Sequence, residues 1–447
     1  MERLQIDFTT EIGKIKPMHA TNNGPAGSAV RNTGIDAAFA AAGIPYARNH
    51  DAAFYSGYGG ENTVDVHRIF RNFAADENDP ASYDFRATDQ YVQRTEACGT
   101  HVFYRLGAAI EHDIKRGTFP PADYLKWARI CAHIIRHYNE GWANGFRYGI
   151  AYWEIWNEPD CRNGDGSNPC WQGTDEEFVE FFCTVLSYLK GQFPYLKIGG
   201  PAFCWGWGGE ERLPHKLLAA MQKRGLTMDF YSFHCYAHDP EQIRINTEEV
   251  DKLLAKYGFA GMETNLNEWN YNCGWNGEDF IRGIEIIKGQ KGASYTTACM
   301  CVGQASSLGM LMYYDARPSA YNGLFDTDTL RILHGYYPFK MFGSLYRLGA
   351  SAAISALPKG LYAAAATNGQ KHALLLTRFD DAAAQGTAGG AITLALGLPA
   401  GKTYRVKQYL LDEENTMAEE EIPLSPDGSV VVSCPMYTVL YLEIEEA

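Results

Sequence analysis

Residues 152–160 read YWEIWNEPD, a short β-rich run that ends in polar residues and a proline. Outward from this segment, similar short runs alternate with amphipathic helical stretches in both directions, which is the pattern of parallel-sheet architectures. The expected strands are 15–19, 44–48, 101–104, 152–156, 197–199, 230–234, 262–267 and 310–314. Eight runs of this kind predict an α/β protein with a (β/α)₈ barrel.

Helix-start signals lie between these runs. Thr174 followed by Glu177 is a capping box in front of an apolar series that begins at Phe178. Thr88 is expected to cap a helix that ends near Gly99. These signals describe the scaffold and carry no chemistry.

The character of the chain changes after Gly349, where short alternating strands are separated by Gly, Pro and Asp. The pattern predicts a barrel over residues 1–349 and an antiparallel β-sandwich over 350–447. Residues 1–10 are a candidate extra strand of the second domain. This domain shows no binding motif, so covering the barrel is its expected role.

Composition and charge exclude several classes of partner. The chain has 39 Lys and Arg against 53 Asp and Glu, a net charge of −14, and its basic residues are scattered. Nucleic acids and anionic membranes are therefore not expected partners. The first ten residues, MERLQIDFTT, have neither a basic start nor an apolar stretch, so we expect a cytoplasmic protein without a signal peptide. The oligomeric state is left open.

Cysteines and glycines give no sign of a cofactor. The 11 cysteines are an odd number without framework spacing, which is typical of intracellular thiols, although pairing of Cys161 with Cys170 stays open. The chain has no HExxH, CxxC pair or calcium-loop motif, so no required metal is expected. Gly199-Gly200-Pro201 lacks the spacing of a nucleotide-binding loop.

Two carboxylates stand where expected barrel strands end. Glu158 follows the fourth strand and Glu268 the seventh, so both are expected at the C-terminal mouth of the barrel. Glycoside cleavage needs such a pair, one to protonate the leaving oxygen and one to attack the anomeric carbon. Glu263 lies at the start of its strand and is expected on the opposite, structural face, while Glu154 lies deeper and is expected in a buried ion pair.

The segments WEIWNEPD and LNEWN (266–270) resemble glycoside hydrolase family 39, in the retaining clan of (β/α)₈ hydrolases. That family includes β-xylosidases and α-L-iduronidases. The resemblance implies Glu158 as the acid/base and Glu268 as the nucleophile. It also implies that Asn157 binds the sugar hydroxyl beside the reacting carbon.

The same resemblance extends to other strand ends. It implies Arg48 near the nucleophile, His50 on a sugar hydroxyl, His234 lining the sugar subsite and Tyr236 orienting the nucleophile. Structural readings stay open for each of them: a barrel-mouth ion pair for Arg48, satisfied core histidines for His50 and His234, and packing for Tyr236. After strand eight this chain has Tyr313-Tyr314-Asp315 where the family often has Trp. Candidate substrate contacts there are Tyr314 and Asp315.

These residues predict a retaining glycosidase that works through a glycosyl-enzyme intermediate on Glu268, with Glu158 protonated and Glu268 ionised near neutral pH. The resemblance implies a β-xyloside as the first expected substrate. Loops 51–87 and 160–173 would wall the cleft into a pocket, which favours action at a chain end. Alternatives keep the mechanism on an arabinoside, galactoside, uronide or internal polysaccharide bond. A non-catalytic carbohydrate-binding homologue is the alternative from another class.

Overall fold

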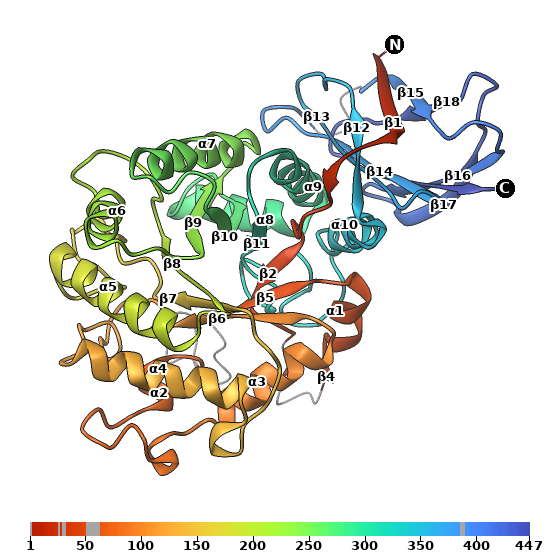
Figure 1. Cartoon of the computed structure of the whole chain (residues 1–447). Helices are drawn as coiled ribbons and strands as arrows, with labels where there is room; N and C mark the ends of the chain where they lie inside the picture. Colours follow the sequence, from red (N-terminus) through yellow and green to blue (C-terminus); the bar gives the residue numbers. More distant parts are fainter. Residues whose placement is uncertain (1, 26, 29–32, 51–62, 385–388) are drawn as a thin grey trace.

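The computed structural model describes residues 2–25, 27–28, 33–50, 63–384 and 389–447. Eight parallel strands close into a barrel in the order β10-β11-β2-β5-β6-β7-β8-β9 (Figure 1). They are β2 (Ala20–Asn22), β5 (Tyr46–Asn49), β6 (His101–Leu106), β7 (Tyr152–Ile155), β8 (Lys197–Phe203), β9 (Phe230–Ala237), β10 (Glu263–Tyr271) and β11 (Met310–Tyr313). The expected (β/α)₈ barrel is confirmed.

Helices pack around the barrel strands. They are α1 (Asp36–Ala42), α2 (Val66–Ile69), α3 (Arg86–Ala97), α4 (Tyr124–Asn139), α5 (Asp175–Gln192), α6 (Leu213–Arg224), α7 (Glu241–Lys256), α8 (Gly277–Lys288), α9 (Gln290–Ala305) and α10 (Tyr336–Leu348), with 3₁₀ turns η1 (Pro80–Ser82) and η2 (Trp142–Asn144). The capping box of Thr174 and Glu177 is present at the start of α5. The expected cap at Thr88 is wrong, because α3 already begins at Arg86 and the buried Thr88 hydroxyl donates to the Thr63 carbonyl instead.

The first barrel strand lies later than expected. Residues 15–19 are a connection, and the strand is β2, whose Thr21 and Asn22 pair with Ala47 and Arg48 of β5. Ile15 and Met18 are buried in the core without pairing in the sheet, so apolar character alone misplaced the strand. The consequence for the site is that Asn22 stands at the C-terminal end of strand one.

Strand β10 contains a bulge that decides which side chains enter the barrel. Leu266 pairs with Phe233 and Glu268 pairs with His234, so Asn267 is an extra residue in the register. Successive side chains of a regular strand point to opposite faces. The bulge removes that alternation, and both Asn267 and Glu268 make contacts inside the barrel.

The second domain is one nine-stranded sheet in the order β17-β16-β19-β14-β13-β12-β1-β15-β18. Its strands are β1 (Glu2–Lys14), β12 (Ala350–Ile354), β13 (Leu361–Thr367), β14 (Lys371–Arg378), β15 (Ala391–Gly397), β16 (Tyr404–Leu411), β17 (Thr416–Ile422), β18 (Ser429–Ser433) and β19 (Val439–Glu446). The short strands β3 (Gly27–Ser28) and β4 (Thr33–Gly34) form a separate two-stranded sheet. The sheet is antiparallel except where β1 runs parallel to β15. The N-terminal strand therefore lies within the C-terminal sheet (Figure 1).

Alternation along β14 explains how this sheet is anchored. Leu374 and Leu376 belong to the apolar core of the second domain, whereas Ala373 and Leu375 belong to the core that it shares with the barrel. The Gln290 side-chain amide at the start of α9 donates to the Leu411 carbonyl at 3.0 Å. One face of the sheet therefore packs on the barrel helices.

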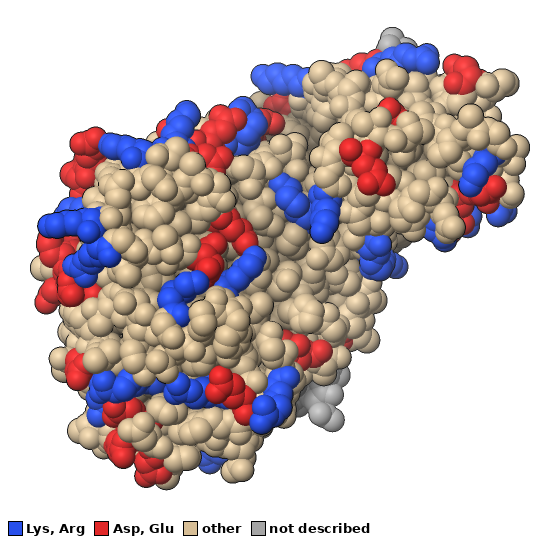
Figure 2. Space-filling view, viewed as in Figure 1, with Lys and Arg blue, Asp and Glu red and all other residues tan. Residues whose placement is uncertain are grey.

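The surface carries both signs of charge. On the face shown in Figure 2, Lys and Arg side chains are interspersed with Asp and Glu rather than gathered into one broad basic patch. Within the described residues, every helix is too short or too polar to cross a lipid bilayer.

Candidate active site

Glu158 reaches the barrel mouth through an unusual backbone turn. After β7 ends at Ile155, Trp156 and Glu158 adopt φ angles of 77° and 47°, a left-handed conformation that is uncommon for residues with a side chain. The turn is held by hydrogen bonds from the Trp156 indole to the Cys170 carbonyl and from the Glu158 amide to the Ala202 carbonyl. Such conformations cluster at functional sites, where the surrounding structure imposes them.

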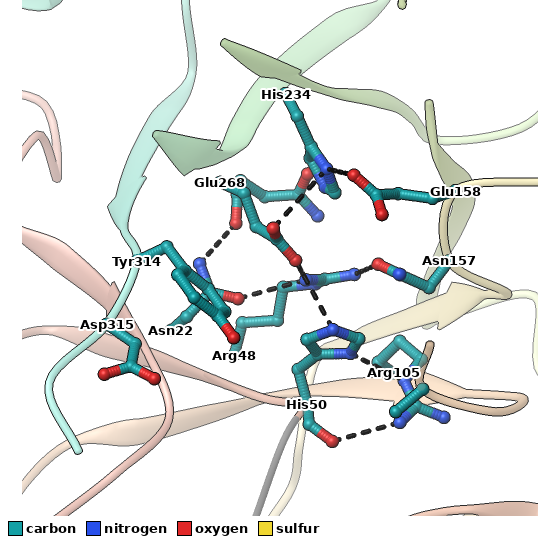
Figure 3. Close-up of polar contacts among 12 residues, drawn as sticks. Asn22, Arg48, His50, Arg105, Asn157, Glu158, His234, Glu268, Tyr314 and Asp315 are labelled. Atoms are coloured by element: carbon teal, nitrogen blue, oxygen red, sulfur yellow. Dashed lines mark hydrogen bonds and ion pairs between the residues drawn. The ribbon is translucent and has the colours of Figure 1, made fainter. Parts of the chain in front are cut away.

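Glu268 faces Glu158 from the bulged strand β10. One carboxylate oxygen of each residue and a ring nitrogen of His234 all lie within 4.8 Å of one another (Figure 3). The Glu268 side chain is 6% exposed and that of Glu158 is 14% exposed. The two carboxyl groups therefore face each other at the C-terminal end of the barrel, where both are largely shielded from solvent.

Arg48 is the fixed cation of this site. Its Nη1 donates to Glu268 Oε1 at 2.7 Å and to Asn22 Oδ1 at 3.0 Å, and its Nη2 donates to Asn157 Oδ1 at 2.7 Å. Its Nε donates to Glu154 Oε2 at 2.6 Å. Burial lowers the pKa of Arg48, but the two carboxylates outweigh burial and raise it, so the guanidinium stays charged. A permanent positive charge at this distance favours the ionised form of Glu268.

Two other glutamates have structural roles, as expected. Glu154 is fully buried under Arg48, where it also accepts from Ser232 at 2.6 Å and Asn267 at 2.5 Å. Glu263 lies at the opposite end of the barrel, where it binds Lys197 and accepts from the Tyr152 hydroxyl. Neither carboxylate faces Glu158.

The surroundings of Glu158 favour its protonated form. Burial, followed by the nearby Cys161 and Asp160, raises the pKa of Glu158 well above its ordinary value, while Arg48 opposes the shift. His234 Nδ1 lies 2.8 Å from Glu158 Oε1. Burial lowers the pKa of His234 to about 4, so this imidazole is neutral at neutral pH and brings no charge that would ionise Glu158.

Tyr236 and His50 hold Glu268 from other sides. The Tyr236 hydroxyl donates to Glu268 Oε2 at 2.9 Å, and His50 Nε2 lies 3.4 Å from Glu268 Oε1. Arg105 donates through Nε to His50 Nδ1 at 3.0 Å. Because Nδ1 is the acceptor, the imidazole proton is assigned to Nε2, which faces Glu268. Burial, with Arg48 and Arg105 nearby, lowers the pKa of His50 well below its ordinary value, so its ring is neutral.

Arg105 of β6 lies beside His50 and forms a buried ion pair. The side chain is fully buried, and its Nη2 lies 2.5 Å from Asp65 Oδ1. Arg105 therefore acts through His50, which it orients, rather than at the surface of the site.

The residues after strand eight divide into one that faces the site and one that does not. The Tyr314 ring lies 6.3 Å from the ring of Tyr236, near the carboxylates. Asp315 is fully buried and accepts from Arg317 Nε at 2.9 Å, and in Figure 3 it lies apart from the facing carboxyl groups. The structure thus pairs Asp315 with Arg317, and its role as a substrate contact stays a prediction.

Exposed aromatic side chains flank the mouth. Trp275 is 57% exposed and lies 5.2 Å from the Tyr236 ring, whereas Trp156 and Trp269 are buried packing residues. Trp205 follows β8 and is 60% exposed. The sequence did not indicate it as a residue of the barrel mouth, because the expected strand ended at residue 199, four residues before the observed end at Phe203. Asn22 was missed for a similar reason, since strand one was placed too early.

Of the two loops expected to wall the cleft, the structure describes only one in full. Residues 51–62 of the loop 51–87 lie outside the described residues. In the loop 160–173, Cys170 and Trp171 are buried beside the turn that bears Glu158. Cys161 and Cys170 are free thiols, so the pairing left open by the sequence is not formed.

Replacing Arg48 with Met should destabilise the protein, because it leaves the buried Glu154 without its cation. Breaking a buried ion pair on one side costs about 3–5 kcal/mol in the free energy of unfolding. Denaturant titration at neutral pH measures this loss, and adding Glu154→Gln to the variant should recover part of it. Arg244→Met, which removes a half-exposed arginine paired with Glu241 and Glu248 on α7, is the control and should change little. Equal losses in both arginine variants would contradict the role of Arg48.

Fold and site together define a class: a (β/α)₈ barrel with facing carboxyl groups and a buried arginine at the C-terminal ends of its strands. Residues 61–258 match the family described as glycosyl hydrolases family 39. A β-xylosidase of Geobacillus stearothermophilus is 27% identical over 235 residues, which are 45% of this chain and 44% of that protein. The chain thus matches less than half of the length of this relative.

Solved structures of similar fold cover the whole chain. A glucosidase from Croceicoccus marinus has a TM-score of 0.78 at 22% identity, covering 100% of this chain and 99% of that one. A family 39 enzyme from Xanthomonas axonopodis pv. citri has a TM-score of 0.72 at 17% identity, covering 100% of this chain and 98% of that one. A monomeric β-xylosidase from Caulobacter crescentus CB15 has a TM-score of 0.71 at 15% identity, covering 100% of this chain and 99% of that one. Residues 61–258 are therefore similar to glycosyl hydrolases family 39, and the whole chain has the fold of these solved structures.

Proposed function

We propose that this chain is a retaining glycoside hydrolase in which Glu158 is the acid/base and Glu268 the nucleophile. The observation that carries the proposal is the approach of their carboxylate oxygens to within 4.8 Å. Retaining enzymes hold the two carboxyl groups about 5–5.5 Å apart, whereas inverting enzymes need roughly 6.5–9.5 Å to admit a water molecule. The gap here suits direct attack by a carboxylate.

In the first half-reaction, Glu268 attacks the anomeric carbon while Glu158 gives its proton to the leaving oxygen. Arg48, Tyr236 and His50 hold the Glu268 carboxylate in place for this attack. Asn157 has its amide oxygen bound to Arg48, so its Nδ2 group is directed to donate to the sugar hydroxyl beside the reacting carbon. The product is a sugar esterified to Glu268 and a released alcohol.

In the second half-reaction, the same pair exchanges roles. Esterification removes the negative charge of Glu268, so Glu158 loses the neighbour whose charge opposed its ionisation. Glu158 then takes a proton from water, which attacks the anomeric carbon and restores Glu268. The first-formed sugar has the anomeric configuration of the substrate.

A terminal β-xyloside is the substrate that we propose first. Support comes from the Geobacillus relative, which is named as a β-xylosidase. Trp275, Tyr236 and Tyr314 offer aromatic faces on which a small sugar ring can pack. A β-glucoside, arabinoside, galactoside, uronide or internal bond would use the same carboxylates with a different subsite. A non-catalytic binder is disfavoured because Glu158 and Glu268 are present together with Arg48 and Asn157, and Arg48 is hydrogen-bonded to both Glu268 and Asn157.

A panel of nitrophenyl glycosides tests the activity, and proton NMR of the first minutes of hydrolysis tests its stereochemistry. We expect the β-xyloside to be cleaved fastest and β-xylose to appear before the α-anomer grows by mutarotation. The α-anomer appearing first would overturn the retaining mechanism. Binding without release on every member of the panel would favour the non-catalytic homologue.

A further inference from the structure

Three thiols gather beside the carboxyl group of Glu158. Cys161 and Cys204 each place their sulfur within 4.8 Å of a Glu158 carboxylate oxygen and of each other. Cys170 Sγ lies 3.9 Å from Glu158 Oε2. The Cys161 side chain also lies beside those of Cys170 and Cys204. All three are free thiols, and the proposed hydrolysis uses none of them.

The backbone around these thiols is held by specific hydrogen bonds. Asp160 accepts from the amides of Cys204 and Trp205, both at 2.9 Å, which ties the loop after β7 to the loop after β8. Asn168 accepts from the Cys170 amide at 2.8 Å. The thiols therefore converge because two loops are clamped together, and little rearrangement is needed to bring them onto one ligand.

We propose that Cys161, Cys170, Cys204 and Glu158 form a binding site for a thiophilic divalent cation, with Zn²⁺ as the best fit. Three sulfurs and one oxygen make a tetrahedral donor set of the kind that Zn²⁺ prefers and that Mg²⁺ and Ca²⁺ do not. Zn–S bonds of about 2.3 Å place tetrahedral sulfurs roughly 3.8 Å apart, so Cys161 and Cys204, whose sulfurs lie within 4.8 Å of each other, need to approach by about 1 Å or less. Cys170 would supply the third sulfur from its position 3.9 Å from Glu158 Oε2.

Binding would exchange protons for the metal. Each coordinating thiol loses its proton to solvent, and so does Glu158, leaving three thiolates and a carboxylate around Zn²⁺ with a net charge of −2. Four-thiolate zinc sites carry the same charge. The charged or titratable groups that act electrostatically on Cys161 include Asp160, Arg162 and His234, besides Glu158 itself.

The functional consequence rests on the proposed function. A Glu158 carboxylate bound to Zn²⁺ has no proton to give, so the metal would switch off the acid/base without touching Glu268. The site would thus be inhibitory, and the reaction itself needs no metal. Metal binding and loss of activity are separate consequences, and each has its own measurement.

Cobalt is the probe for binding, because Co²⁺ held by thiolates gives an S→Co²⁺ charge-transfer band in the near ultraviolet. Titration of the full, reduced chain should raise this band to saturation at one Co²⁺ per chain, and Zn²⁺ should abolish it. Cys161→Ser and Cys204→Ser should each weaken binding by about tenfold or more. Cys98→Ser is the matched control, since Cys98 is a half-buried thiol beside the Asp36 carboxylate, and should bind as the parent does.

No charge-transfer band, or a band unchanged in both the Cys161 and Cys204 variants, would overturn the site. Unfolding temperatures of the variants ensure that a lost band does not reflect a lost fold. In the activity assay, Zn²⁺ should inhibit the parent reversibly on addition of a chelator and should inhibit both variants at least about tenfold more weakly. A cobalt band without zinc inhibition would remove Glu158 from the ligand set. If no glycoside is cleaved at all, the proposed function fails while the cobalt band still decides the metal site.

Discussion

Glu268→Gln should lower kcat/KM for an aryl β-xyloside by at least about 10⁴-fold, because the variant lacks the nucleophile and cannot form the covalent intermediate. Gln keeps the size of the side chain and an oxygen that accepts from Tyr236, so the fold should survive. The loss should therefore appear in kcat rather than in the unfolding temperature. Initial rates and thermal unfolding, measured on the same preparation, check this result.

Chemical rescue sharpens the assignment of Glu268. Glu268→Gly opens space for azide, which should attack the anomeric carbon directly and give a glycosyl azide of inverted configuration. Glu263→Gln is the matched control, because Glu263 lies on the same strand at the opposite end of the barrel, and its hydrolysis rate should stay near that of the parent. A parent-like rate in Glu268→Gln would refute the nucleophile.

Glu158→Gln should produce a loss that depends on the leaving group. General acid catalysis contributes about 10²–10⁴-fold, so a poor leaving group such as an alkyl xyloside should slow by this factor. A dinitrophenyl xyloside needs no proton to depart, and the glycosyl-enzyme should form at a rate near that of the parent. The intermediate should then accumulate, because the variant also lacks the base for water.

Added azide distinguishes Glu158 from Glu268. In Glu158→Gln, azide should attack the accumulated intermediate, accelerate turnover and give a glycosyl azide of retained configuration. An inverted azide product, or equal losses for alkyl and dinitrophenyl xylosides, would contradict the acid/base role. The configuration of the product thus tests each carboxylate independently of the size of the rate loss.

The raised pKa of Glu158 sets the direction of the pH dependence. The protonated acid is the active form, so kcat/KM of the parent should fall as the pH rises through the elevated pKa of Glu158. Stability follows the same sign: the neutral form is favoured in the fold, and its contribution is present below the unfolded pKa and lost as the pH rises through the folded pKa. Glu158→Gln should therefore lose less thermal stability than the parent at alkaline pH. An unchanged alkaline decline in both kcat/KM and stability would contradict this origin.

The barrel could be predicted because each strand and helix has a local signature. The run before Glu158 and the capping box at Thr174 depend on residues within a few positions of each other. The first strand was misplaced because Ile15 and Met18 are apolar for packing rather than for pairing. Residues buried in a connection and residues paired in a sheet are both apolar, so the sequence does not distinguish them. The pairing with β5 identifies β2 as the first barrel strand.

The candidate site was predicted from strand ends and from a family resemblance. The structure brings Glu158, Glu268, Arg48, His234 and Tyr236 into direct contact. The partners of Asp315 could not be read from the sequence, because Asn23, which donates to its carboxylate with Arg317 and Ser319, lies 292 residues earlier in the chain.

Local patterns were enough to predict a (β/α)₈ barrel with acidic residues after strands four and seven, because the alternation of strands and helices and the strand ends are local properties. Two further features depend on the tertiary structure: the carboxylates of Glu158 and Glu268 meet within 4.8 Å, and the surroundings of Glu158 raise its pKa well above the ordinary value. The bulge at Asn267 and the position of Arg48 bring the two carboxylates together. Burial beside Cys161 and Asp160 raises the pKa of Glu158. The cluster of three thiols around Glu158 also depends on the tertiary structure. Cys204 comes from a different loop, and the hydrogen bond from its amide to Asp160 brings it beside Glu158.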